Sequence, residues 1–288
     1  MIGIFDSGSG GLSVLREILR ILPKEKYVYY SDNANCPYGE KSVEFIRNRA
    51  REITRLLISK GAQIIVVACN TATAAAISVL REEFPVKFIG MEPAIKPAAL
   101  SSKTGVIGVL ATAGTLKASR YLNIKEMFGD GTKIAEHVGE GFVELVENGI
   151  LDGPEAEETV RKSVQPLVAA GADRIVLGCT HYPFLRMVIE RVAGPGVQVI
   201  DPAPAVARHL AEVMKQEGLL DHEYADVPAA AEPVTEGQTA AGQAAGEPEA
   251  AHPAAEIELI ASGPELPARR LLDTIISGHA GRQTATKS

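Results

Sequence analysis

The chain has 288 residues, of which 46% are hydrophobic and 23% are charged, and its net charge is −7. This composition is typical of a soluble globular protein, and the acidic balance predicts no basic surface for nucleic acid. The opening residues MIGIFDSGSGG do not resemble a signal peptide, and no apolar run approaches the roughly 20 residues that cross a bilayer. Three cysteines argue against a disulfide framework, so we expect a reducing, cytoplasmic setting.

The N-terminal part alternates short apolar runs with segments of helical periodicity. Strands are predicted at IGIF, YVYY, QIIVVA and VKFIG, which occupy residues 2–5, 27–30, 63–68 and 86–90. Helices are predicted between them, over residues 12–22, over residues 46–57 and from about Asn70. This alternation predicts a mainly parallel sheet with helices on both faces.

The same alternation restarts after a break at PAALSSK, residues 97–103. Strands are predicted at residues 104–111, 174–178 and 197–201, and helices from about Thr115, around 142–147, over 155–170 and from about Pro183. The two halves align, because Cys69 and Cys179 are followed at similar distances by Pro93-Ala94 and Pro202-Ala203. We interpret this as an internal duplication; chance similarity between α/β segments is the alternative.

The predicted fold class is α/β, with two similar domains and an active site in the cleft between them. Each domain is expected to be a mainly parallel sheet flanked by helices, one over residues 1–96 plus 206–288 and the other over 97–205. The segment 225–255 is rich in Ala, Glu and Pro, which predicts a disordered insertion. After it come a predicted strand at 256–262, a helix at 267–277 and a frayed tail at 278–288.

Polar or ionisable residues follow most of the predicted strands. Ligands of open α/β sheets bind beyond the carboxyl ends of the strands. The residues at these ends are therefore expected to share one rim: Asp6-Ser7, Asp32-Asn33, Cys69-Asn70-Thr71, Glu92, Ala111-Thr112, Cys179-Thr180-His181 and Asp201.

Cys69 and Cys179 each lie between a predicted strand and a predicted helix. The amides and dipole at the start of a helix favour a thiolate. A buried cysteine can instead be a small core hydrophobe, but two equivalent placements beside Asn or Thr favour a pair of reactive thiols. A disulfide between them is unexpected in a reducing setting, and nothing near Cys69 completes a metal site.

Two further residues are candidates to ionise these thiols. His181 is a candidate base for Cys179, and its alternative is a surface loop histidine. Asp6 is a candidate base for Cys69, and its alternative is a helix N-cap.

Two loops are expected to contact a ligand. The glycine-rich GSGGLS, residues 8–13, predicts a tight turn that lets a small ligand, such as a carboxylate, approach the backbone. The loop DNANCPYGEKS, residues 32–42, could close over a substrate through Tyr38 or be an ordinary connection. Cys36 in this loop is interpreted as incidental.

Two thiols on opposite faces of a carbon acid can invert its stereochemistry. A thiolate removes the α-proton while a thiol delivers a proton to the far face, and the two exchange roles in the reverse reaction. A duplicated α/β unit supplies two such groups related by pseudo-symmetry. Substrate carboxylates also need hydrogen-bond donors, for which the candidates are Ser7, Asn70, Thr71, Thr112, Thr115 and Thr180.

Four motifs together resemble the glutamate racemases, which belong to the cofactor-independent aspartate/glutamate racemase superfamily. They are GIFDSGSGGLSVL, PYGEKS, ACNTATA and LGCTHYP, and they occur in the family's order and spacing. The resemblance extends from about residue 2 to 215 and resumes weakly at ASGPE, residues 261–265. The chain departs from the family pattern at SDNANCPYG and in the insertion 225–255.

The resemblance implies roles for individual residues. Cys69 resembles the thiol that deprotonates D-glutamate and Cys179 the one that acts on L-glutamate, assisted by Asp6 and His181. Glu147 resembles a carboxylate near the second cysteine. The implied glutamate-contacting positions are Asp6, Ser7, Pro37, Tyr38, Gly39, Asn70, Thr71, Thr112, Thr180 and His181.

The resemblance also implies a biological setting. The family uses neither PLP nor a metal, supplies D-glutamate for peptidoglycan, and commonly forms homodimers. One alternative is a racemase of the same superfamily that acts on aspartate or another amino acid. The other is a non-catalytic α/β ligand-binding protein whose cysteines are inert core residues.

Overall fold

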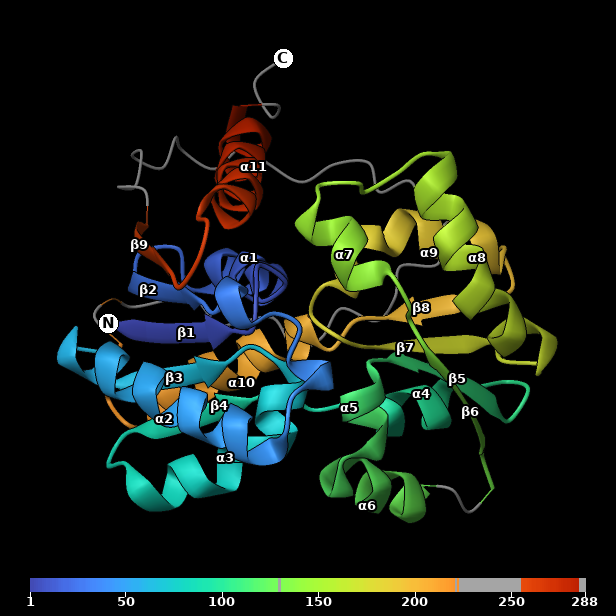
Figure 1. Cartoon of the computed structure of the whole chain (residues 1–288), viewed down its shortest axis with the longest axis horizontal. Helices are drawn as coiled ribbons and strands as arrows, with labels where there is room; N and C mark the ends of the chain where they lie inside the picture. The colour runs from blue at the N-terminus through green and yellow to red at the C-terminus, as the bar shows by residue number, and fades with distance from the viewer. Residues whose placement is uncertain (129–130, 221, 223–254, 285–288) are drawn as a thin grey trace, which may run out of the picture.

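Two parallel β-sheets form the centre of the molecule and lie side by side (Figure 1). The computed structural model describes residues 1–128, 131–220, 222 and 255–284. The first sheet has the strand order β4-β3-β1-β2-β9 and the second the order β6-β5-β7-β8, with every neighbouring pair parallel. The predicted α/β class with two similar parallel-sheet domains is therefore confirmed.

The first sheet is covered by helices on both faces. Its strands are β1 (Ile2–Asp6), β2 (Lys26–Ser31), β3 (Ile64–Val67), β4 (Lys87–Gly90) and β9 (Glu256–Ala261). One face packs against α1 (Leu12–Ile21), α10 (Ala203–Gln216) and α11 (Leu266–Thr284), and the other against α2 (Val43–Ser59) and α3 (Asn70–Glu83). Short 3₁₀ helices η1 (Asn33–Asn35) and η2 (Tyr38–Glu40) follow β2. Because both faces are buried, β3 is apolar along its whole length and β1 is apolar up to its last residue, Asp6.

The second sheet repeats this arrangement. Its strands are β5 (Val106–Ala111), β6 (Lys133–Val138), β7 (Arg174–Gly178) and β8 (Gln198–Ile200). Helices α7 (Phe142–Glu147), α8 (Pro154–Ala169) and α9 (Arg186–Ala193), with η3 (Tyr182–Leu185), belong to the core on one face. Helices α4 (Ile95–Ser101) and α6 (Ser119–Phe128) cover the other, and α5 (Ala113–Lys117) precedes α6.

A single hydrophobic core continues from one sheet to the other. The cluster that holds Ile4 of β1 also holds Leu177 of β7 and Phe142 of α7. This shared core fixes how the two sheets face each other, and so it positions the ends of β1, β3 and β7 around one crevice.

Several sequence-based predictions need correction. Residues 97–103, expected to be a break, lie mostly in α4, and neither β6 nor α10 was predicted. The last helix continues to Thr284, beyond its predicted end at residue 277. The predicted insertion 225–255 lies outside the described residues except for Ala255.

The expected domain boundaries at 96/97 and 205/206 fall inside α4 and α10, and they stay a prediction. Among the described residues, none of the helices has the length and apolar character needed to span a membrane.

Candidate active site

The two cysteines lie at the carboxyl ends of β3 and β7 and line the same pocket. Cys69 is the N-cap of α3, and its sulfur accepts a hydrogen bond from the Ala72 amide at 3.4 Å. Cys179 directly follows β7 and precedes η3. Both side chains are nearly enclosed, with 5% and 8% of their surface exposed. One thiol from each domain therefore faces a common space, as the strand-end rule predicted.

The pocket collects most of the predicted binding residues. Its lining consists of Ser7, Pro37, Tyr38, Gly39, Cys69, Asn70, Thr71, Thr112, Val143, Gly178, Cys179, Thr180 and His181. Thr115 does not line the pocket, but its hydroxyl oxygen lies 3.0 Å from that of Thr112 and 3.3 Å from that of Thr71. Asp6 and Glu147 lie behind the lining, where they bond to residues that do reach the pocket.

Two lining residues were missed by sequence reasoning. Val143 is an apolar position on α7, and nothing in its neighbourhood distinguishes it from a core residue. Gly178 belongs to the LGCTHYP motif, where a Cβ would come within 2.6 Å of the Ala111 Cβ. The motif contained a signal for Gly178, because only a glycine lets β7 approach β5 so closely.

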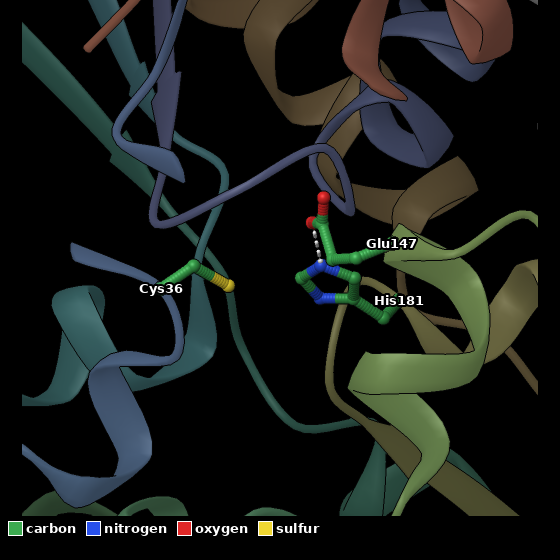
Figure 2. A group of neighbouring side chains, drawn as sticks. All are labelled: Cys36, Glu147 and His181. Atoms are coloured by element: carbon green, nitrogen blue, oxygen red, sulfur yellow. Dashed lines mark hydrogen bonds and ion pairs between the residues drawn. The ribbon is translucent and has the colours of Figure 1, made fainter. Parts of the chain in front are cut away.

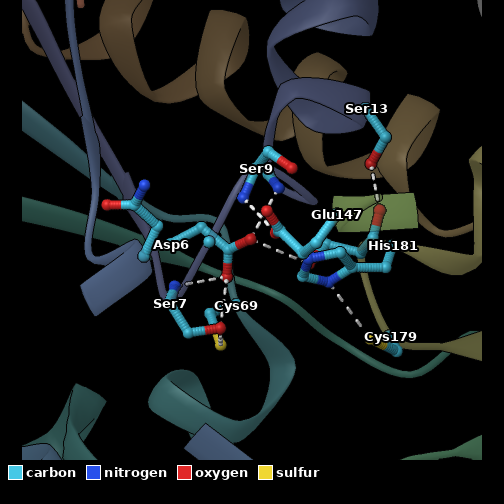
Figure 3. A network of polar contacts seen from close by, with 12 residues as sticks. Asp6, Ser7, Ser9, Ser13, Cys69, Glu147, Cys179 and His181 are labelled. Carbon is cyan, nitrogen blue, oxygen red and sulfur yellow. Dashed lines mark hydrogen bonds and ion pairs between the residues drawn. The ribbon is translucent and has the colours of Figure 1, made fainter. Parts of the chain in front are cut away.

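Cys69 is linked to a buried carboxyl through a serine (Figure 3). The Cys69 thiol lies 3.7 Å from the Ser7 hydroxyl, which in turn lies 3.3 Å from Asp6 Oδ1. Asp6 also accepts hydrogen bonds from the Ser7 and Gly11 amides, each at 2.7 Å. Burial raises the pKa of Asp6, so this carboxyl takes up a proton more readily than an ordinary aspartate.

Burial also raises the pKa of the Cys69 thiol well above its usual value, and the nearby Asp6 charge adds to the effect. The Ala72 amide at the start of α3 works in the opposite direction but does not outweigh burial. The helix start therefore favours the Cys69 thiolate in the expected direction, but burial and the Asp6 charge outweigh it and leave the pKa of this thiol raised.

Cys179 has a different set of partners. Its sulfur lies 3.7 Å from His181 Nδ1, while His181 Nε2 lies 2.7 Å from Glu147 Oε1. Glu147 Oε1 also accepts a hydrogen bond from the Ser9 amide at 2.8 Å, so a group of the first domain holds this carboxylate (Figure 3).

The charges of His181 and Glu147 stabilise each other. Burial works to lower the pKa of His181, but contacts with Cys179, Cys36 and Glu147 outweigh it and raise that pKa well above its usual value. Burial raises the pKa of Glu147, and its contacts with His181 and the Ser9 amide bring it below the usual value. The pair is therefore an imidazolium beside a carboxylate at neutral pH.

The glycine-rich turn admits protein side chains where a ligand was expected. A Cβ on Gly10 would lie 2.4 Å from His181 Nδ1. A Cβ on Gly8 would lie 2.4 Å from Glu147 Oε1 and 2.9 Å from the Cys36 sulfur. The small residues at 8 and 10 thus make room for the partners of Cys179. Cys36, interpreted as incidental from sequence, belongs to this neighbourhood.

The expected polar rim is only partly formed. Asp32 is fully buried and bonds to Arg49 and Tyr38 behind the loop that follows β2. Glu92 is exposed, Asp201 accepts a bond from the Ala203 amide at the start of α10, and neither lines the pocket. Both follow edge strands, β4 and β8, whereas the crevice opens beside the inner strands.

The fold and the site define a class: a two-domain α/β protein that brings one cysteine from each domain into one buried pocket. The chain belongs to the Asp/Glu/Hydantoin racemase family, which its residues 2–210 match. It is therefore an amino-acid racemase, an enzyme of the isomerase class.

Known proteins similar to this chain agree with that family. The glutamate racemase of Methylococcus capsulatus is 50% identical over 224 residues, which cover 78% of this chain and 83% of the relative. The glutamate racemase of Pseudomonas aeruginosa is 45% identical over 228 residues, covering 79% of this chain and 86% of the relative.

Solved structures show the same fold. An Escherichia coli glutamate racemase, solved with L-glutamate and the activator UDP-MurNAc-Ala, is 31% identical with a TM-score of 0.74. A Bacillus anthracis glutamate racemase is 29% identical with a TM-score of 0.77. Each comparison covers 96% of this chain and 94% of the other.

Proposed function

We propose that this protein is a glutamate racemase that interconverts L- and D-glutamate with two cysteine bases and no cofactor. The observation that carries the proposal is the placement of Cys69 and Cys179, from different domains, in the lining of one pocket. Similarity to glutamate racemases along more than three quarters of the chain supports glutamate over aspartate as the substrate.

The proton transfers follow from the partners of each thiol. For L-glutamate, the Cys179 thiolate, paired with the His181 imidazolium, removes the α-proton, and the C–H bond gives an S–H bond. The Cys69 thiol then donates its proton to the opposite face of the carbanion and becomes a thiolate. D-glutamate reverses both transfers, so no electrons are exchanged with any other reactant.

Each side has a group that can manage the proton afterwards. Asp6, whose pKa is raised by burial, is suited to receive a proton from Cys69 through the Ser7 hydroxyl. On the other side, Glu147 stabilises the positive charge of His181 while Cys179 is ionised. These roles explain why the two thiols have unlike neighbours.

Binding of two substrate carboxylates is assigned to neutral donors. His181 is the sole basic side chain among the pocket-lining residues, and it faces Cys179. The amides that begin α3, together with the hydroxyls of Thr71, Thr112 and Thr180, are therefore the proposed carboxylate-binding groups.

The proposed product, D-glutamate, is a component supplied to peptidoglycan synthesis in the related family. A cytoplasmic location suits the mechanism, because both thiols must stay reduced. We also propose a homodimer, on the basis of the family resemblance, which light scattering on the purified protein will test.

The decisive experiment follows L-glutamate in D₂O without added PLP or metal. We expect the α-hydrogen to exchange and the optical rotation to fall to zero, with aspartate giving much slower exchange. Cys69→Ala and Cys179→Ala should each lower racemisation by at least about 10²-fold, because each direction needs both groups. Cys36→Ala is the matched thiol control and should keep most of the activity, since its sulfur does not line the pocket.

Full racemisation by either single variant would contradict the two-base mechanism. A wild-type protein that exchanges the α-hydrogen of neither amino acid would favour the ligand-binding alternative. Preferential exchange of aspartate would move the assignment to the other substrate of the superfamily.

A further inference from the structure

Cys36, Glu147 and His181 converge from three separate segments of the chain (Figure 2). Cys36 lies between η1 and η2 in the first domain, Glu147 ends α7, and His181 precedes η3 in the second domain. One sulfur, one carboxylate oxygen and one imidazole nitrogen all lie within 4.8 Å of one another. The proposed racemisation uses Glu147 and His181 but has no role for the Cys36 thiol.

This donor set matches the coordination chemistry of zinc. Zn²⁺ binds thiolate sulfur at about 2.3 Å and imidazole nitrogen or carboxylate oxygen at about 2.0–2.2 Å, so its ligand atoms lie roughly 3.3–3.8 Å apart. The cluster is already close to that spacing. His181 Nε2 and Glu147 Oε1, at 2.7 Å, need only move apart slightly when an ion replaces the proton between them.

The site is open to a cation from one side. Cys36 and Glu147 are partly exposed, with 20% of the Glu147 side chain accessible, whereas His181 is buried. Gly8 lies against both the Cys36 sulfur and the Glu147 carboxylate and has no Cβ to separate them. Three protein ligands with a fourth position left for water make an open site of the kind zinc accepts.

We propose that Cys36, Glu147 and His181 form an inhibitory Zn²⁺ site at the edge of the racemase pocket. Binding releases the Cys36 thiol proton and the proton on His181 Nε2. No atom changes its oxidation state. That zinc inhibits the enzyme rests on the proposed function. The metal site itself rests only on the positions of the three side chains.

Inhibition follows from what the ion does to His181 and to the domains. With Nε2 bound to the metal, the ring keeps its Nδ1 proton and no longer switches between the imidazolium and the neutral form, as the proposed proton exchange with Cys179, 3.7 Å away, requires. The ion also ties the loop that carries Tyr38 and Gly39, both pocket-lining residues, to the opposite domain. Substrate exchange and proton transfer are blocked together.

The test uses Co²⁺ as a spectroscopic probe of the full-length reduced protein. A thiolate-to-cobalt charge-transfer band should appear in the wild type and be displaced by Zn²⁺. It should be lost in both Cys36→Ala and Cys36→Ser, because neither variant has the thiolate, yet persist in Cys69→Ala and Cys179→Ala. In parallel, Cys36→Ala should raise the Zn²⁺ concentration that half-inhibits racemisation by at least about tenfold, as expected when one of three zinc ligands is removed.

Circular dichroism and thermal unfolding establish that each variant is folded. No band in the wild type, or a band that survives in Cys36→Ala, would overturn the site. Metal binding without any glutamate racemisation would defeat the proposed function but leave the site standing. Racemisation that zinc inhibits equally in wild type and Cys36→Ala would defeat this inference alone.

Discussion

The two cysteines differ most in what stands behind them. Cys69 is connected through Ser7 to the buried carboxyl of Asp6, and Cys179 contacts the imidazole of His181. A carboxyl with a raised pKa and an imidazolium with a raised pKa are two ways of keeping a proton near a thiol. In the proposed mechanism, the residue pairs therefore serve the same chemistry through different acids.

Replacing Glu147 with Gln tests this account of His181. The variant removes the negative charge that favours the imidazolium, so the pKa of His181 should fall, and kcat should drop by up to about 10²-fold. Because the folded-state pKa of His181 is raised, its stabilising contribution is present below the unfolded pKa and is lost as pH rises through the folded pKa. In Glu147→Gln, the stabilising contribution of the His181 charge should be lost at a lower pH than in the wild type.

The measurement is an NMR titration of the six histidines with isotope-labelled imidazoles, combined with denaturant unfolding across neutral to alkaline pH. An unchanged His181 titration in the variant would show that Glu147 does not hold the imidazolium.

Gly10→Ala should displace the His181 ring without disturbing the fold elsewhere. The new Cβ would lie 2.4 Å from Nδ1, so the ring must shift, and a shift of this size in an acid–base group lowers kcat by about 10²-fold. Gly196→Ala is the matched control, because nothing lies within 4 Å of its Cβ position. The measurement is steady-state kinetics of both variants, with circular dichroism to establish that they are folded. Equal activities would contradict the proposal that a Cβ at position 10 displaces the His181 ring.

The sequence supports part of this residue-level description. Strand-end placement predicted that Cys69, Cys179 and His181 meet at one rim, and they do line one pocket, because parallel strands end at one edge of a sheet. Glu147 was identified only by resemblance, since its helix is amphipathic and gives no chemical signal. The approach of Cys36 to His181 depends on how two distant domains meet, which no local pattern contains.

At the scale of elements, the loop after β2 is held from behind. Arg49 on α2 makes two hydrogen bonds to Asp32, at 2.7 and 3.0 Å, and the Tyr38 hydroxyl donates to the same carboxylate at 2.5 Å. Burial raises the pKa of Asp32, but the bonds from Arg49, Tyr38 and Asn35 outweigh it and lower that pKa. Because Tyr38 lines the pocket, the Asp32 carboxylate fixes the shape of the pocket-lining part of the loop that follows β2.

Asp32→Asn should destabilise the protein by about 1.5–3 kcal/mol at pH 7, because charged hydrogen bonds to a buried group are lost. The KM for glutamate should rise as the loop loosens. Because the folded-state pKa of Asp32 is lowered, its contribution is present above the unfolded pKa of about 3.9 and is lost as pH falls through the folded value. The two proteins should therefore converge in stability at acid pH.

Denaturant unfolding from pH 7 downward measures this difference. Glu83→Gln, which breaks the exposed pair with Arg51 between α2 and α3, is the matched control and should change stability far less. A difference between wild type and Asp32→Asn that does not narrow in acid would contradict the assigned pKa direction.

Elements with a clear apolar period were predicted well, and those without one were missed. Strand β6, KIAEHV, is a partly exposed edge strand that carries charges, so its pattern is weak. Helix α10 has Pro202 as its N-cap and Pro204 in its first turn. Two closely spaced prolines are typical of a loop, although proline is tolerated in a first helical turn. Helix α4 is short and contains Pro97.

At the scale of the whole molecule, hydrogen bonds between the domains gather around the pocket. The Ser13 hydroxyl donates to the Thr180 carbonyl at 2.8 Å, and the Thr180 hydroxyl lies 3.3 Å from Asp6 Oδ2. The hydroxyls of Thr71 and Thr112 meet across the crevice at 3.2 Å. The relative position of the domains and the geometry of the site therefore depend on the same contacts.

Ser13→Ala should expose that dependence. Ser13 is buried and does not line the pocket, yet its loss leaves the Thr180 carbonyl without this donor. We expect a loss of about 1 kcal/mol in unfolding free energy, a lower kcat, and faster amide hydrogen exchange around residues 178–182. Ser59→Ala, which removes a bond within α2 alone, is the control. Unchanged exchange and kcat in Ser13→Ala would separate domain placement from catalysis.

The different surroundings of Cys69 and Cys179 cannot make the overall reaction favour one enantiomer. Enantiomers have equal free energies in water, so the equilibrium constant of the proposed reaction is one and kcat/KM must be identical in the two directions. Burial raises the pKa of Cys69, and in the proposed mechanism the form with Cys69 protonated is the one that acts on L-glutamate. If kcat differs between the L-to-D and D-to-L directions, KM must therefore differ by the same factor. An enzyme with two unlike thiols still yields equal amounts of the two enantiomers at equilibrium.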